Sequence, residues 1–238
     1  GTCKTSAAQN QKGIKEGKAM GEFLHVAEIA FPLLFQGILV TIQISVLAII
    51  MAIVIGAVVA YMKISDMVLL KAIAEIYIKI FRNTPFMVQV YLAYYGLPML
   101  GLNVPAFWTG ALILGFYTAA YVAVILESGL SSLPKGQSEA AYAIGMSKTK
   151  TLLRILLPQT VVVIIPSITG QLVQTVKDSS ILSIITVAEM TMMTKEAIGI
   201  TFSPLIVYIC VGLLYWALNL VIELSSKKIE KSYKRRSI

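Results

Sequence analysis

The chain has 238 residues, of which 57% are hydrophobic and only 13% are charged, and its net charge is +8. A soluble domain usually carries about 25% charged residues, so this chain has more apolar surface than a single soluble core can hide. In a soluble protein the positive charge would suggest nucleic acid as a partner. Here the lysines and arginines flank apolar segments, which indicates a membrane protein with no nucleic-acid partner.

The first thirty residues differ from the rest. Residues 1–18 are polar and residues 21–30 are amphipathic, and no signal peptide with a charged start, a short apolar core and a cleavage site is visible. We expect residues 1–30 to form an extracytoplasmic extension whose last part, residues 22–30, lies on the membrane surface as an interfacial helix. Met20 is an alternative start, and the polar terminus is expected to be poorly ordered.

Five apolar stretches follow, each long enough for a bilayer crossing, which needs about 20 apolar residues. They cover residues 31–62, 69–100, 106–126, 155–176 and 203–224. They predict an all-α, polytopic membrane protein with five transmembrane helices in a domain of residues 31–226. Pro85 lies inside the second stretch and predicts a bend there. The apolar run at 181–187 is too short to span and is expected to be re-entrant or interfacial.

Lysines and arginines set the expected orientation. They concentrate in the tail of residues 227–238, in the long loop between the third and fourth stretches, and in the turn after the first stretch. The positive-inside rule places these regions in the cytoplasm. With five crossings the N-terminus is then outside, in a multi-pass protein of the bacterial inner membrane.

The long cytoplasmic loop contains a segment that predicts a short, exposed helix. Ser138 can cap this helix, and Glu139 then lies in its first turn, against the positive end of the helix dipole. The small side chains of Ala140 and Ala141 allow another surface to approach closely. Gly145 permits the left-handed turn that ends the helix. Such a helix suits docking into a groove on a soluble partner.

This segment, with Ile155-Leu156-Leu157-Pro158 after it, resembles the EAA motif of the permeases of ABC importers. The resemblance implies a type I ABC importer permease fold. It also implies that residues 138–146 form the coupling helix, which sits in a cleft of a separate ATPase subunit. The implied coupling residues are Glu139, Ala140, Ala141 and Gly145.

Three further segments resemble the polar amino acid permeases of the histidine, arginine and glutamine type. They are Phe81-Arg82-Asn83-Thr84-Pro85, Ala119-Ala120-Tyr121 and Lys177-Asp178-Ser179-Ser180-Ile181. The resemblance implies a dimer with a second copy or a homologous permease, two ATPases that bind ATP and magnesium, and an extracytoplasmic substrate-binding protein. The chain departs from the family at Val124, where glutamate is frequent, and at Glu127, where arginine is frequent. The missing acid at 124 favours a neutral polar substrate, such as glutamine or cystine, over a cationic one.

Ionisable groups inside a span are costly and mark a transport pathway by default. Arg82 offers a planar fork for the carboxylate of a free amino acid, and Asp178 offers an acceptor for its ammonium group. Thr84, Gln89 and Tyr121 are candidates for neutral hydrogen bonds to the substrate. Two alternatives remain open: an ion pair from Arg82 or Lys177 to Asp178 that only holds helices together, and interhelical hydrogen bonds by Gln89 and the tyrosines.

The expected function is therefore the permease subunit of an ABC importer that moves polar amino acids by alternating access, embedded in membrane lipid. The chain contains no phosphate-binding loop of the type Gly-x-x-x-x-Gly-Lys-Ser/Thr, so it is not expected to be an enzyme or to hold a cofactor itself. One histidine and two unrelated cysteines predict no metal site. The alternatives are an ion-coupled secondary amino acid transporter, which usually shows paired internal repeats, and a membrane scaffold that transports nothing.

Overall fold

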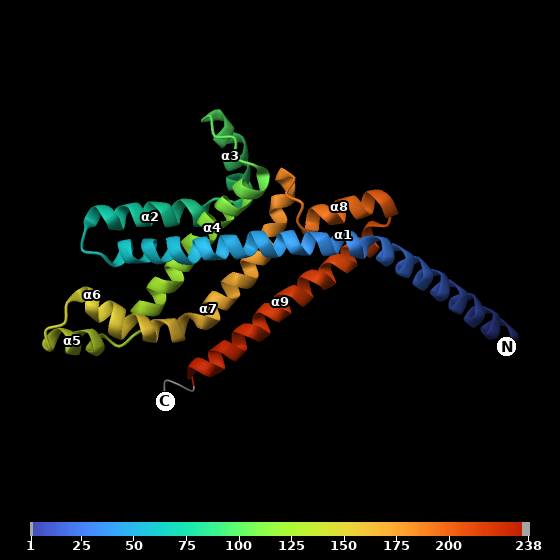
Figure 1. The fold of residues 1–238 in the computed structure, drawn as a ribbon. Helices are drawn as coiled ribbons and strands as arrows, with labels where there is room; N and C mark the ends of the chain where they lie inside the picture. The colour runs from blue at the N-terminus through green and yellow to red at the C-terminus, as the bar shows by residue number, and fades with distance from the viewer. Residues whose placement is uncertain (1, 235–238) are drawn as a thin grey trace.

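The protein is all-α within residues 2–234, the part that the computed structural model describes; side chains are described for residues 20–228, 230 and 231 (Figure 1). The α-helices are α1 (Thr2–Ile64), α2 (Val68–Asn83), α3 (Phe86–Met99), α4 (Ala106–Ser131), α5 (Lys135–Ala143), α6 (Lys148–Thr151), α7 (Leu157–Asp178), α8 (Met190–Thr201) and α9 (Pro204–Lys234). A π-helical turn, η1 (Leu152–Leu156), precedes α7, and a 3₁₀ helix, η2 (Ser179–Ile185), follows it.

Four helical segments within the described residues are long and apolar enough to cross a membrane. They cover Met20–Ile64, Ala106–Ser131, Lys148–Ile185 and Pro204–Lys228. The predicted class of an all-α, polytopic membrane protein is thus confirmed, but the predicted count of five spanning helices is wrong. The second predicted stretch is divided into α2, with 16 residues, and α3, with 14 residues.

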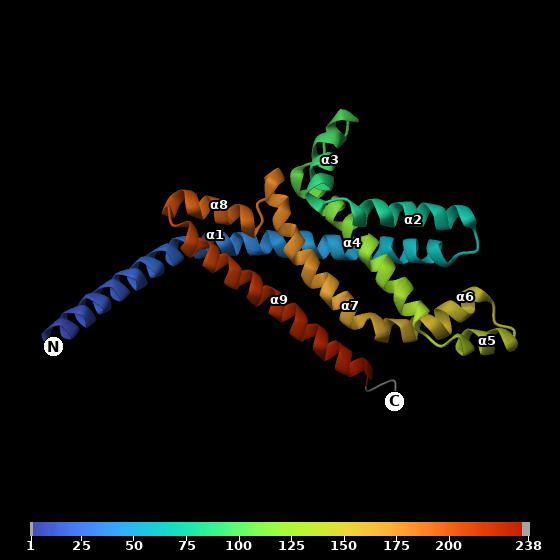
Figure 2. The ribbon, with the colours of Figure 1, turned by 180° about the vertical axis from the view of Figure 1, so that it is seen from behind.

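The division between α2 and α3 follows from Pro85. Proline has no backbone N–H and disfavours the helical conformation at the residue before it. Thr84 accordingly adopts extended angles, with φ −111° and ψ 143°, and α2 ends at Asn83. A second helix starts at once after Pro85 and runs away from α2, as both views show (Figure 1 and Figure 2). The sequence predicted a bend where the structure has a complete break.

The spanning helices cross one another around the middle of α1. Helix α2 turns back along the C-terminal half of α1, while α4 and α7 run obliquely across it (Figure 1). A buried cluster joins α1, α3, α4 and η2 through Ile44, Val90, Leu114 and Leu182. Most of the short apolar run at 181–187, which we expected not to span, forms η2 at this junction. Thr186, the residue that follows η2, has a left-handed φ of 62°.

The N-terminal segment is part of α1 rather than a separate helix. Backbone of residues 2–30 continues into the first span without interruption, through Pro32. Val26, Ala27 and Ala30 are buried against α8 and α9. The expectation that residues 22–30 lie on the membrane surface stays a prediction. The expected disorder of the polar terminus also stays a prediction, because the side chains of residues 1–19 lie outside those that the structure describes.

Large apolar side chains remain exposed along the spanning helices. Examples are Phe35, Val46 and Ile50 on α1, and Leu213 and Trp216 on α9. Contiguous apolar surface of this kind indicates contact with lipid or with another subunit.

Close packing between α1 and α8 depends on Gly37. A Cβ at this position would lie 2.6 Å from Met190 Cα and 2.9 Å from its backbone nitrogen. Backbone atoms cannot move aside as a flexible side chain would, so we expect Gly37→Ala to destabilise the protein by about 1–3 kcal/mol. Thermal unfolding of the purified protein in detergent measures the loss.

Gly21 on the same helix is the matched control, because nothing lies within 4 Å of a Cβ there. Gly21→Ala should leave the unfolding midpoint unchanged or raise it slightly, since alanine favours the helix. Equal midpoints for Gly37→Ala and the unsubstituted protein would contradict the packing described for α1 and α8.

Candidate functional site

The first candidate region lies where the end of α2 meets α4. The Arg82 guanidinium carbon lies 5.2 Å from the centre of the Tyr121 ring, a cation–π contact. The Tyr121 hydroxyl lies 3.2 Å from that of Tyr117, one turn earlier on α4. Arg82 is exposed. Among the described side chains, no carboxylate lies within ion-pair distance of Arg82.

Asp178, at the end of α7, is linked to the same region. Helix α7 contacts α4 through a hydrogen bond of 3.2 Å between Thr175 Oγ1 and Thr118 Oγ1, one turn before Asp178. One carboxylate oxygen accepts a hydrogen bond of 2.7 Å from Gln174 Nε2, and the other is buried without a hydrogen-bond partner. A buried, unsatisfied carboxylate oxygen is unusual in proteins and has a strong demand for a donor. Among the described residues, none supplies a donor to this oxygen.

Two residues predicted to contact substrate form hydrogen bonds at the helix break, and their contact with substrate stays a prediction. Gln89 is buried, and its Nε2 donates to Phe81 O at 2.9 Å, Thr84 O at 3.1 Å and Thr84 Oγ1 at 2.7 Å. Thr84 Oγ1 donates in turn to Ile80 O at 2.8 Å. These bonds satisfy carbonyls that the end of α2 leaves free. Gln89 Oε1 keeps no partner and remains an open acceptor.

The predicted substrate residues therefore fall into two groups. Arg82 contacts Tyr121, whose hydroxyl lies beside that of Tyr117, a residue that the sequence did not single out, while Asp178 lies on the neighbouring helix α7. Thr84 and Gln89 are bonded to each other at the break. The alternative of an ion pair from Arg82 or Lys177 to Asp178 is not formed among the described residues. The alternative of a hydrogen-bonding role for Gln89 agrees with its contacts, which lie within the α2–α3 segment.

The second candidate region is the short helix α5, at the end of the molecule where α4 finishes (Figure 1). It starts earlier than the sequence indicated: Pro134 occupies the N-cap position and Lys135 begins the helix. Ser138 lies inside the helix and donates to Lys135 O, so its predicted capping role is wrong. The physical reason is that Pro134 already has the fixed φ that helix entry requires. Glu139 consequently lies in the second turn.

The end of α5 is as predicted. Gly145 has φ of 82°, and its N–H donates to Tyr142 O at 2.9 Å. The N–H of Met146 donates to Ala141 O at 3.0 Å. These two bonds form a Schellman motif, which needs a residue that adopts left-handed angles without strain. The chain then turns sharply toward α6.

The outer face of α5 is small and partly apolar. Glu139, Ala140 and Gly145 are exposed, whereas Ala141 is buried against the protein body. Ile144 is 78% exposed, which is costly for a side chain of this size in water. Helix α5 and its C-terminal turn therefore present an outward face that another protein would cover. On the opposite face, the buried Ala141 packs the helix against the rest of the protein.

The departure from the family pattern at position 127 has a structural explanation. Glu127 forms an ion pair of 2.6 Å with Lys63, at the end of α1, and both side chains are partly buried. The carboxylate compensates the charge of this lysine, which an arginine at position 127 would oppose. Within the described residues, no cluster of three or more metal-binding side chains occurs.

Comparisons with known proteins agree on one family. The family model described as "Binding-protein-dependent transport system inner membrane component" matches residues 52–235. The arginine transport system permease protein ArtQ of Bacillus subtilis is 33% identical over 204 residues, covering 85% of this chain and 93% of that protein. The probable glutamine ABC transporter permease protein GlnM of Bacillus subtilis is 32% identical, covering 85% and 96%. The solved structure titled as an amino acid ABC transporter with histidines superposes with a TM-score of 0.82 at 30% identity, covering 88% and 98%.

The hydrogen bonds of Gln89 predict a structural effect that does not depend on substrate. Gln89→Leu removes the donor from the carbonyls of Phe81 and Thr84, and we expect a loss of about 1–3 kcal/mol in the substrate-free protein. Thermal unfolding in detergent without added ligand measures it. Gln43→Leu, at an exposed position of α1, is the control and should cause no loss. An unchanged midpoint for Gln89→Leu would show that the helix break does not depend on this amide.

Proposed function

The chain belongs to the family of binding-protein-dependent transport system inner membrane components and is the permease subunit of an ABC amino acid importer; on this premise we propose how its residues carry a polar amino acid through the membrane. The proposed mechanism is alternating access, driven by ATP hydrolysis in a separate subunit. No feature of the chain or its relatives supports the ion-coupled alternative.

The proposal depends on one observation: the short helix α5, which follows α4, is exposed on its outer face. Its Schellman turn fixes the direction in which the chain leaves the helix, so a force on α5 is passed to α6, η1 and α7. We propose that α5 binds in a cleft of the ATPase subunit, which contacts Glu139, Ala140 and Gly145. Ala141, on the opposite face of the helix, packs against the rest of the permease. The ATP and magnesium would be bound by that subunit.

The proposed substrate region is the cluster of Arg82, Tyr121 and Asp178. A free amino acid carries a carboxylate, which suits the guanidinium of Arg82, and an ammonium, which suits the unpaired oxygen of Asp178. The relatives carry the names of arginine and glutamine transporters, and both substrates share these α-groups. Val124 has no charge to offer a cationic side chain, so a neutral polar amino acid such as glutamine or cystine is the preferred substrate.

The proposed orientation places α5 and the basic tail in the cytoplasm and the N-terminus outside. The ion pair between Lys148 and Asp66 supports one part of it, because it shows that the α1–α2 turn and the α5–α6 segment lie at the same end. These are two of the three lysine-rich and arginine-rich regions that the positive-inside rule assigns to the cytoplasm. Arg235 and Arg236 lie outside the described residues. A substrate-binding protein would then deliver the amino acid at the opposite end, to a pair of permease chains.

Coupling can be tested with substitutions at Gly145 and Ala140 in the α5 region. Gly145→Ala forces a side chain into left-handed backbone angles, at a cost of about 1–2 kcal/mol, and should distort the turn. We expect substrate-stimulated ATP hydrolysis by the reconstituted importer to fall several-fold, with weaker co-purification of the ATPase. Ala140→Trp should have the same effect by steric exclusion, since Ala140 is exposed.

Gly136→Ala is the matched control, because this glycine lies in α5 with nothing within 4 Å of a Cβ and no left-handed angle. It should preserve coupling. If Gly145→Ala and Ala140→Trp both retained normal stimulation and ATPase binding, α5 would not be the docking element.

The substrate region predicts a change in apparent affinity. Arg82→Gln and Asp178→Asn each remove one charge-assisted contact, so the KM for transport should rise about 10- to 100-fold. Uptake of labelled amino acids by proteoliposomes containing the complete importer measures it. Lys79→Gln, which removes an exposed charge on α2, is the control and should not alter KM. An unchanged KM in both site variants would place the substrate elsewhere while leaving the coupling results unaffected.

A further inference from the structure

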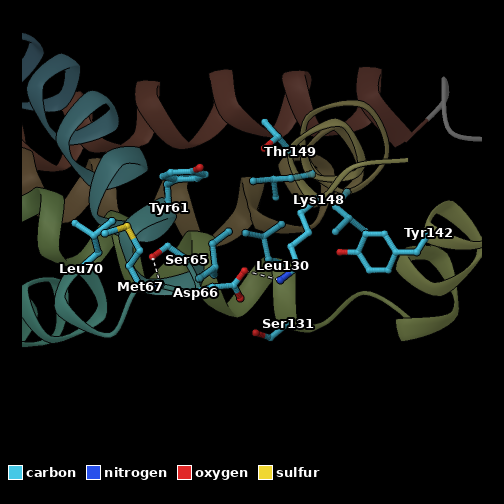
Figure 3. Close-up of a pocket in the computed structure, with 13 residues that line it drawn as sticks. Tyr61, Ser65, Asp66, Met67, Leu70, Leu130, Ser131, Tyr142, Lys148 and Thr149 are labelled. Atoms are coloured by element: carbon cyan, nitrogen blue, oxygen red, sulfur yellow. Dashed lines mark hydrogen bonds and ion pairs between the residues drawn. The ribbon is translucent and has the colours of Figure 1, made fainter. Parts of the chain in front are cut away.

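A cavity of about 540 Å³ lies at the end of the molecule that carries α5. Its walls come from the end of α1, the start of α2, the end of α4, the α5–α6 segment and η1. Figure 3 shows Tyr61, Met67 and Leu70 on one side of this space and Tyr142 and Thr149 on the other. It is separate from the Arg82 region, and neither the transport mechanism nor the family match assigns it a role.

The cavity lies where the spanning segments end. Ile64 closes the first candidate span, Ser131 closes the second and Lys148 opens the third, and all three residues line the cavity. Turns that face lipid lie outside the hydrocarbon core, because their backbone groups need water or headgroups as partners. The α1–α2 turn lines the cavity through Ser65, Asp66 and Met67, so we place the cavity near the depth of lipid headgroups. By the proposed orientation it faces the cytoplasmic leaflet.

The inner wall of the cavity is apolar. Leu70, Leu130, Leu152 and Leu156 supply it, from three different elements. A small polar solute would leave this surface in contact with trapped water, which is unfavourable. A ligand that carries a hydrocarbon chain as well as a polar group would cover these leucine side chains.

The mouth of the cavity is charged. Lys148 Nζ lies 2.5 Å from Asp66 Oδ2, and Figure 3 shows the two side chains pointing at each other. The hydrogen bond and charge of Lys148 hold the pKa of Asp66 below its usual range, so Asp66 is ionised at neutral pH. The side chains are 71% and 77% exposed, so water weakens their attraction and an incoming ligand can separate them at little cost. Lys71, whose charge also acts on Asp66, adds a second cation nearby.

We propose that this cavity binds a phospholipid whose headgroup carries both a phosphate and a primary amine, as in phosphatidylethanolamine. The phosphate contacts Lys148, the ammonium donates to Asp66, and the start of the acyl chains covers the leucine wall. A glycerol headgroup leaves Asp66 without a cation. A choline headgroup has no N–H to donate to Asp66. The amine-bearing lipid alone satisfies both charges.

The test measures lipid binding to the intact importer by native mass spectrometry, with phosphatidylethanolamine, phosphatidylglycerol and phosphatidylcholine offered at equal concentration. We expect phosphatidylethanolamine to be retained about tenfold more than the other two. Asp66→Asn should remove this preference and favour phosphatidylglycerol, because the remaining lysines attract an anion. Lys148→Gln should lower the retention of both.

Glu223→Gln and Lys227→Gln provide matched controls, because this pair is exposed on α9 and lies at 2.7 Å. Neither should change lipid retention. Ser131→Phe fills the cavity without changing its charges and should reduce the retention of all three lipids. Equal retention of the three headgroups by the unsubstituted protein, or an unchanged preference in Asp66→Asn, would overturn the proposal. Since the charged side chains are exposed, unfolding midpoints should match in every charge variant.

Discussion

The end of a helix leaves backbone carbonyls without intrahelical partners, so a break within the protein must find donors for them. The break at Pro85 meets this requirement with the amide of Gln89, which reaches back to Phe81 O and Thr84 O. The amide fixes α3 relative to the last turn of α2. That turn carries Arg82, whose position over Tyr121 depends on where α2 ends. The position of Arg82, the candidate residue for binding the substrate carboxylate, thus depends on the side-chain amide of Gln89.

Much of this architecture can be predicted from local sequence patterns, because apolar runs and glycine turns act over short distances. The first, third, fourth and fifth apolar stretches coincide with spanning segments, and Gly145 adopts the left-handed turn. The helix count was wrong because hydropathy does not distinguish a bent helix from two helices. Ser138 was misplaced as a cap because Pro134 was the better helix start.

The rest of the site depends on contacts between residues distant in the chain, which no local pattern contains. Lys63 meets Glu127 and Asp66 meets Lys148 only because the ends of α1 and α4 lie close to the start of α6. The role of Gln89 in the helix break is a similar case, since the amide could equally have faced a substrate. Tyr117 has no distinguishing signal in the sequence, because it is one tyrosine among several on an apolar helix, and its packing on Phe86 of α3 depends on the fold.

The charges of the molecule are arranged in two ways, and the difference bears on specificity. At the cytoplasmic end, as proposed, Lys63 and Lys148 have carboxylate partners. In the Arg82 region, the cation rests on an aromatic ring and Asp178 accepts from an amide, and neither forms an ion pair among the described side chains. Uncompensated charges at membrane depth are costly. A zwitterion would compensate both at once without adding net charge. Since every free amino acid brings the same two groups, the proposed site would select the class, and in this proposal the selection among side chains rests on neutral positions such as Val124.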